Sequence, residues 1–409
     1  MRRLSFYLLL VFVFAVPWEN VIQIGGGKTG SGIIGIAAVG LALITCLLEG
    51  RVARPPAFLF TFGALVTWQL ATYFWSYDQS MTLVRAATMI QLLAMIWLIA
   101  ESCVGERERL QLMQAFVLGC VVTCLVLVYA YSSGQSIADY RYAPEVFDPN
   151  DSAVVIAAGI PMALLITTSA GRSLFRWVNV AYVPLALFAV ILTASRTGFI
   201  SACVGLLGVF FVLRFTNSTY CLLWSVVILA IFIAVFFLLP VTHALEQNIE
   251  RITFAGDVES LSTLTNRTNI WAAGRDMFFE HPAGGVGFGT FAAVAEIAIG
   301  KWRVAHNLWI QTAAETGVVG LTLLITALGA ALIPALRCRG FRVPFHILLF
   351  LTLMTMSLAL DVVANKSLWI ALALLSVARP LLSYAPVAEE PRGLSAKAGA
   401  LQPDTAGMQ

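Results

Sequence analysis

The stretch QLMQAFVLGCVVTCLVLVYAY, residues 111–131, contains no Asp, Glu, Lys or Arg. A helix of about 20 apolar residues is long enough to cross the hydrocarbon core of a bilayer. Similar runs recur along the 409-residue chain, which is 59% hydrophobic and only 11% charged. Because soluble domains are about 25% charged, the sequence predicts a polytopic membrane protein.

Twelve such runs are separated by short clusters of Arg, Pro, Gly and Asn. The predicted spans are 4–17, 31–48, 57–75, 82–100, 111–131, 152–170, 177–194, 199–213, 221–240, 310–336, 345–363 and 367–384. Every span is expected to be a helix, because a lipid-exposed backbone must satisfy its hydrogen bonds internally. The predicted fold class is therefore all-α. The first run follows Arg2 and Arg3 like a secretory signal, but Pro17 interrupts it and no cleavage site follows, so it is interpreted as an uncleaved span.

The predicted spans divide the chain into four parts. Residues 1–240 hold nine spans, residues 241–306 form a large loop, residues 307–384 hold three spans, and residues 385–409 are expected to be a disordered tail. Short basic segments, among them those with Arg2 and Arg51, share one side of this topology. The positive-inside rule then places both termini in the cytoplasm and the large loop on the opposite side of the membrane.

The large loop is too long for a simple connection and is expected to carry structure of its own. NRTNIWAAGRDMFFE, residues 266–280, spaces its apolar residues as in an amphipathic helix. A glycine-rich turn follows at 281–291, and a second short helix is predicted at 292–300. The aromatic residues of the loop are typical of a segment that lies at the membrane interface.

Ionisable residues of the spans collect at the face that carries this loop. Arg85 lies at the outer end of one span, Arg196 in a tight turn between two spans, and Glu315 near the start of span 310–336. A transporter needs polar groups near the bilayer midplane, so this arrangement favours an enzyme whose lipid-borne substrate arrives laterally. A flippase or transporter stays as an alternative, whereas the small net charge of +3 does not indicate nucleic-acid binding.

Arginines before threonine are the first candidates for a site. Arg196 in SRTG and Arg267 in NRTN suit a diphosphate, because guanidinium groups bind phosphate oxygens bidentately. Arg275 follows Arg267 by eight residues, about 80° around an ideal helix, so it could share that side. For each of these, and for Arg303 and Lys301, the alternative is an interfacial cation that reaches lipid phosphates.

His306 stands where the large loop re-enters the membrane. A lone histidine is either a structural hydrogen-bonding residue or a general base, and an ordinary imidazole pKa near 6.5 suits base chemistry at neutral pH. GGVGFG, residues 284–289, is either a plain turn or a backbone nest for phosphate. In FDPNDSA, residues 147–153, the polar residues either cap the following helix, with Asn150, Asp151 or Ser152 as the cap, or contribute to a metal site.

NRTNIWAAGRDMFFEHPAGGVGFGTF, followed by AHNLWIQTAAETGVVG, resembles the signature region of the O-antigen ligase and polymerase superfamily of bacterial envelope glycan assembly. The order of motifs is similar over roughly residues 145–320. The resemblance implies a GT-C-like helical fold at the periplasmic face of the inner membrane. It also implies a glycan donor linked to undecaprenyl diphosphate, with neither a metal nor another cofactor.

The resemblance implies roles for three residues: Arg196 and Arg267 would hold the diphosphate, and His306 would position or deprotonate the acceptor hydroxyl. Further candidates for substrate binding are Arg85, Asp151, Arg275, Arg303 and Asn307. The predicted enzyme is a metal-independent, inverting glycosyltransferase that moves a lipid-linked glycan onto lipid A core. A repeat-unit polymerase, which extends a growing glycan with the same donor chemistry, is the alternative.

Overall fold

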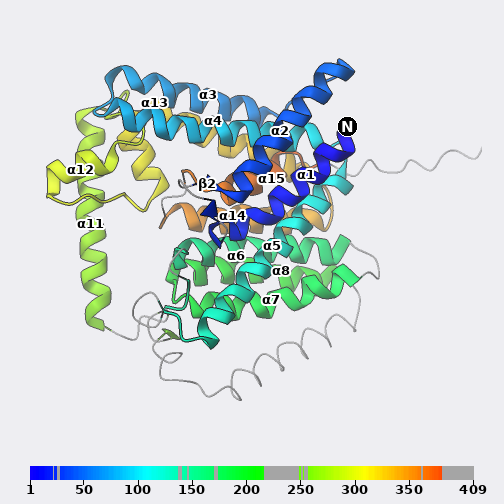
Figure 1. The fold of residues 1–409 in the computed structure, drawn as a ribbon. Coiled ribbons are helices and arrows are strands. Elements are labelled where there is room, and N and C mark those ends of the chain that lie inside the picture. The colour runs from blue at the N-terminus through cyan, green and yellow to red at the C-terminus, as the bar shows by residue number, and fades with distance from the viewer. Residues whose placement is uncertain are drawn as a thin grey trace, which may run out of the picture.

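The computed structural model describes residues 1–21, 23–24, 28–136, 141–144, 147–169, 174–215, 248–249, 252, 257–360 and 363–379. These residues are almost entirely helical (Figure 1). The strands that they contain form one small ribbon, in which β1 (Gln23–Ile24) pairs antiparallel with β2 (Lys28–Thr29). The all-α fold class of a polytopic membrane protein is confirmed.

Nine helices of the described residues are long and apolar enough to cross a membrane. They are α1 (Arg2–Ala15), α2 (Gly30–Glu49), α3 (Ala57–Ala71), α4 (Gln79–Ser102), α5 (Glu106–Ser132), α6 (Pro149–Ser169), α7 (Leu174–Leu192), α8 (Arg196–Phe215) and α13 (Leu308–Leu336). The 3-10 helix η1 (Val16–Val21) extends α1, and the 3-10 helix η2 (Thr72–Trp75) extends α3. Two shorter apolar helices follow, α14 (Arg342–Ser357) and α15 (Lys366–Ser376). Nine of the predicted spans coincide with the nine long helices, whereas 345–363 and 367–384 overlap the two shorter ones. The predicted span 221–240 and the predicted tail 385–409 lie outside the described residues.

The most buried spanning helix is α6, which packs against α5, α7, α8 and α14. Its small residues explain the close packing, because small side chains let helix backbones approach one another in a membrane. Gly198 of α8 lies directly against Ala153 of α6. The hydroxyl of Tyr182 on α7 donates to the carbonyl oxygen of Ile156, 2.6 Å away. The α6 contacts thus fix the first turns of α6 and α8 beside each other.

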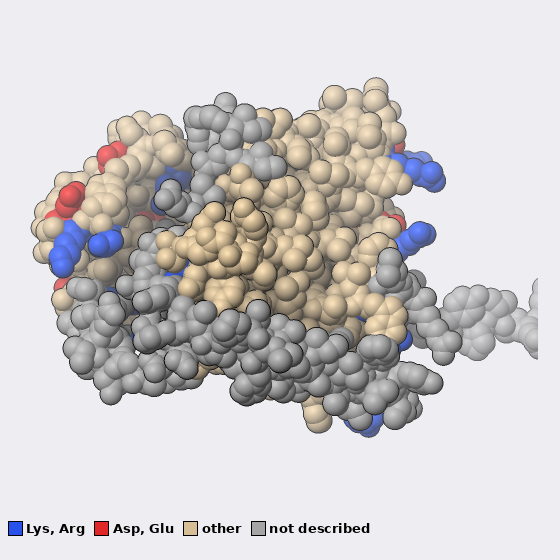
Figure 2. Space-filling view, turned by 60° about the horizontal axis from the view of Figure 1, so that its bottom comes forward, with Lys and Arg blue, Asp and Glu red and all other residues tan. Residues whose placement is uncertain are grey.

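Charged side chains gather at the two ends of the bundle, as the face in Figure 2 shows. The N-terminus lies at one end, where Arg2 pairs with Glu49 at 2.6 Å and donates to the carbonyl oxygen of Arg51. Two further helices, α11 (Asp257–Glu280) and α12 (Phe291–Ile299), lie at the opposite end, which we call the α11 end (Figure 1). The basic segments with Arg2 and Arg51 and the described helices of the large loop therefore lie at opposite ends, as the predicted topology requires.

The helices of the large loop form a small unit with its own core. In Figure 1, α11 runs across the ends of the spanning helices rather than alongside them. It begins at Asp257, earlier than the predicted start at 266, whereas α12 lies within one residue of its predicted bounds. A hydrophobic cluster separate from the main core joins this unit to the start of α13; its buried members are Ile270, Ala273, Met277, Val286, Phe291, Ala295, Ala305 and Ala314.

The glycine-rich turn is docked into a break in α13. Gly317 has φ 66° and ψ −166°, outside the helical region. The carbonyl oxygens of Ala314 and Glu315 accept the N–H groups of Val286 and Gly287, each at 3.0 Å. Beyond the break, the N–H of Val318 donates to the carbonyl oxygen of Pro282 at 2.8 Å. The turn therefore replaces the intrahelical partners that the break removes.

The same hydrogen bonds decide between the two interpretations of GGVGFG. The N–H of Gly285 donates to the carbonyl oxygen of His281, and the N–H of Phe288 donates to Oγ1 of Thr72 at 2.9 Å. With the bonds to α13, four consecutive N–H groups, from Gly285 to Phe288, have acceptors within the protein. The structure thus supports a plain turn that locks the loop unit onto the bundle, and these N–H groups do not form a phosphate nest.

Replacing Gly317 with alanine is expected to destabilise the protein by about 1–3 kcal/mol, because an L-residue is strained at positive φ. The new Cβ would also collide with the backbone of Ala283. The matched control is Gly329→Ala on the same helix, where no atom lies within 4 Å of the added Cβ. Thermal unfolding in detergent should show a lower Tm for the first variant only, and equal Tm values would contradict the docking of the turn.

Candidate functional site

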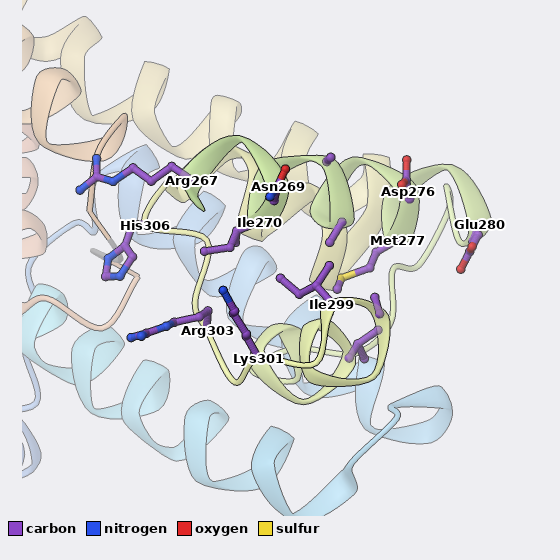
Figure 3. Close-up of a pocket in the computed structure, with 14 residues that line it drawn as sticks. Arg267, Asn269, Ile270, Asp276, Met277, Glu280, Ile299, Lys301, Arg303 and His306 are labelled. Carbon is purple, nitrogen blue, oxygen red and sulfur yellow. The ribbon is translucent and has the colours of Figure 1, made fainter. Parts of the chain in front are cut away.

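A cavity of about 750 Å³ lies between α11, α12 and the segment 301–306 (Figure 3). We call it the main cavity. The α11 residues that line it recur every three or four positions, which places them on one helical face. The lining residues are Arg267, Asn269, Ile270, Ala272, Ala273, Asp276, Met277, Glu280, Val294, Ala298, Ile299, Lys301, Arg303 and His306.

Positive and negative side chains occupy different ends of the main cavity. Arg267, Arg303 and His306 lie near one another at one end, and Lys301 reaches toward them, whereas Asp276 and Glu280 lie at the other end (Figure 3). Partial burial lowers the pKa of the Arg267 guanidinium through desolvation, yet an arginine side chain stays protonated in proteins. A partly desolvated cation interacts more strongly with an anion than a fully hydrated one does. The cationic end therefore suits a phosphate or diphosphate group.

The backbone around His306 holds its ring at this end of the cavity. His306 has φ 48°, in the left-handed region that residues other than glycine seldom adopt. On one side, Nε1 of Trp271 donates to the carbonyl oxygen of Ala305 at 2.9 Å. On the other side, Oδ1 of Asn307 caps α13 by accepting the N–H of Trp309 at 3.0 Å. Such strain costs about 1–3 kcal/mol and is typical of functional sites.

Asn307 was predicted to bind substrate, and the structure uses both ends of its side-chain amide within the protein. Besides capping α13, its Nδ2 donates to the carbonyl oxygen of Leu358 at 3.0 Å. The side chain is 7% exposed. These contacts fix the residue that follows His306, so Asn307 orients the segment.

The structure brings Arg267, Arg303 and His306 to one cavity and places the other predicted residues elsewhere. Arg196 is the first residue of α8 and does not line the main cavity. Arg275 is largely exposed, pairs with Asp276 at 2.9 Å and does not line it either. The 80° offset from Arg267 is thus enough to turn Arg275 away from the cavity.

Two predicted residues line separate cavities at the α11 end. Arg85 lines a cavity of about 430 Å³ beside the start of α13. Asp151 lines one of about 250 Å³, where Lys366 and Glu19 form an ion pair at 2.6 Å.

A side chain caps the start of α6, as predicted, but it is not Asn150, Asp151 or Ser152. Oδ1 of Asp148 accepts the N–H groups of Asn150 at 2.7 Å and Asp151 at 3.3 Å. Asp148 therefore caps the helix, and Pro149 occupies the first helical position, where a missing N–H costs nothing.

Two features of the candidate site escaped the sequence-based prediction. The acidic end of the main cavity, Asp276 and Glu280, could have been found from the helical face of Met277, because Glu280 follows Met277 by three residues and Asp276 by four. The bond from Trp271 to Ala305 joins residues 34 positions apart. No local pattern signals that contact, because it exists only once the loop unit has folded.

Residues 181–325 match the family model described as O-antigen ligase. Over these residues the chain is similar to the O-antigen ligase family. The matched region includes the second half of α7, the helices α8, α11 and α12, and α13 as far as residue 325. It contains every residue that lines the main cavity. Among curated proteins, none matches the chain. This similarity points to a glycosyl-transfer type of enzyme and to lipid-linked glycans as the class of substrate, and the apolar helices indicate a multi-pass membrane protein.

Proposed function

We propose that the protein transfers a glycan from undecaprenyl diphosphate to lipid A core at the periplasmic face of the bacterial inner membrane. The observation that carries the proposal is the cationic end of the main cavity, where Arg267, Arg303 and His306 lie near one another inside the region that matches the O-antigen ligase family model. The α11 end would face the periplasm, because the basic segments with Arg2 and Arg51 lie at the opposite end. Both termini would then be cytoplasmic.

In the proposed reaction, His306 accepts the proton of the acceptor hydroxyl while the hydroxyl oxygen attacks the anomeric carbon. The bond between that carbon and the diphosphate oxygen breaks, and its electron pair leaves with the diphosphate. Arg267 and Arg303 stabilise the negative charge that grows on the leaving group, which is the main contribution that fixed cations make. A single displacement inverts the anomeric carbon, and the donor already carries a good leaving group, so the proposed mechanism requires no metal.

Arg196 has a separate role in the proposed function, because it does not line the main cavity. It begins α8, beside the start of α6, at the same end of the bundle as the main cavity. It would contact the donor outside that cavity, where a threonine hydroxyl and the first N–H groups of a helix also favour anions.

Deleting the gene and separating lipopolysaccharide and lipid-linked glycans on gels tests the proposal. We expect bare core, with long polymer left on undecaprenyl diphosphate. Core that bears a single repeat unit would instead identify a polymerase with the same donor chemistry. Unchanged lipopolysaccharide would overturn both functions.

Trp271 is expected to act as a positioning residue for His306. Trp271→Phe keeps an aromatic ring but loses the 2.9 Å hydrogen bond to Ala305. One hydrogen bond contributes about 1 kcal/mol, so kcat should fall about 5- to 10-fold while the KM for the donor stays unchanged. The control is Trp177→Phe on α7, whose side chain is exposed. Unchanged kcat, or a loss confined to KM, would contradict the positioning role.

A further inference from the structure

A second cavity adjoins the main one at the α11 end. It measures about 430 Å³ and lies between the first turns of α4, the first turns of α13 and the segment 301–306. Its polar lining comes from Asp78, Ser80, Arg85, Gln311 and Glu315, and Trp302 contributes an aromatic ring. We call it the side cavity. Because it is built on the ends of two spanning helices, a molecule held by the membrane can reach it.

The segment 301–306, which is neither helix nor strand, lies between the two cavities. Lys301 and Arg303 line the main cavity, whereas Trp302 and Val304 line the side cavity. This alternation is the pattern that an extended backbone gives, because successive side chains then point to opposite faces. Strict alternation would place His306 with Trp302 and Val304, and its left-handed φ instead returns the ring to the main cavity.

Gln311 presents a buried acceptor in the side cavity. Its side chain is 3% exposed, and its Nε2 donates to Oε1 of Glu315 at 3.3 Å. Its Oε1 has no hydrogen-bond partner within the described part of the chain. Buried polar atoms in folded proteins nearly always form a hydrogen bond. A ligand with an O–H or N–H donor would supply the missing partner of this oxygen.

The charges of the side cavity argue against a phosphate ligand. The carboxylates of Asp78 and Glu315 lie there with a single arginine, Arg85. The main cavity, in contrast, concentrates Arg267, Lys301 and Arg303 at one end. A ligand that offers many hydroxyl groups and no charge fits mixed amide, carboxylate and guanidinium partners. Trp302, 51% exposed, adds an apolar surface beside them.

We propose that the side cavity binds a neutral sugar unit of one of the two glycans, away from the reacting hydroxyl. This inference rests on the proposed function, because it assumes glycan substrates. A sugar held there would anchor the glycan behind the segment 301–306, while the reacting group lies beside His306 in the main cavity. Binding energy gained at a remote unit can then orient the reacting group.

Calorimetry with the full-length protein in nanodiscs tests the proposal with two probes. One is the delipidated core oligosaccharide, and the other is the O-polysaccharide released from its lipid. Gln311→Leu and Trp302→Ala should each weaken binding of one probe by at least about 10-fold, and the affected probe identifies the acceptor or the donor glycan as the source. The matched control is Gln135→Leu, an exposed glutamine just after α5.

Wild-type protein that binds neither probe, or variants that bind both probes like wild type, would overturn the proposal. Thermal unfolding shows whether each variant is folded. Trp302→Ala is less prone to destabilise the protein, because that residue is half exposed. Failure here would be distinguishable from failure of the proposed function. In the first case, gene deletion would still leave bare core, whereas in the second it would leave lipopolysaccharide unchanged.

Discussion

Replacing His306 with asparagine is expected to lower the rate of glycan transfer by at least about 100-fold, since general-base catalysis contributes roughly 10²–10⁴. Asparagine is the informative substitution because it tolerates the left-handed backbone that His306 adopts, φ 48°, better than alanine does. The variant should therefore keep its fold and its donor affinity. Single-turnover assays with purified lipid-linked donor and acceptor in nanodiscs measure the rate.

The matched control for this prediction is His281→Asn. His281 is exposed in the same loop unit and does not line the main cavity. It should keep full activity. Full activity in His306→Asn as well would remove His306 from the mechanism and leave only the charge stabilisation at the cationic end.

Arg267→Ala is expected to cost about 10²–10³ in kcat/KM for the donor, the range seen when one preorganised group that stabilises transition-state charge is removed. The guanidinium lies at the cationic end of the main cavity, where partial burial lowers its pKa by desolvation and water screens it less. Arg267→Lys should restore part of the loss, because lysine supplies the charge without the bidentate fork. Steady-state kinetics with varied donor concentration measure both effects.

The control for Arg267 is Arg339→Ala, an exposed arginine in the turn between α13 and α14, at the end of the bundle away from α11. Its activity should match that of the wild type. If Arg267→Ala retained wild-type kcat/KM, the cationic end of the main cavity would not be the diphosphate site. Arg196 at the start of α8 would then be the stronger candidate.

Much of the membrane architecture could be predicted because it follows from local chemistry. A run such as 111–131 must be helical in lipid whatever its neighbours are, and α5 contains it. The loop helix that carries Arg267 was also predictable from apolar periodicity, although α11 begins earlier than expected. His306 at the junction of loop and span was recognisable as a candidate, because a lone polar residue beside an apolar helix stands out in the sequence.

Other features depended on contacts between distant parts of the chain. Helical spacing could place Arg275 near the side of Arg267, but only the packing of α11 decided that it points away from the main cavity. The sequence also grouped Arg196 with Arg267, whereas the packing of α8 against α6 separates Arg196 from the residues that line that cavity.

An all-α membrane protein with a structured loop at one face could be predicted without a structure, because hydropathy and helical periodicity are properties of short segments. The arrangement of that loop into a candidate site depends on long-range packing. The glycine-rich turn docks into the break at Gly317, and Trp271 holds the backbone beside His306. These contacts join residues far apart in the chain, so their geometry arises only when the loop unit and the ends of the spanning helices pack together.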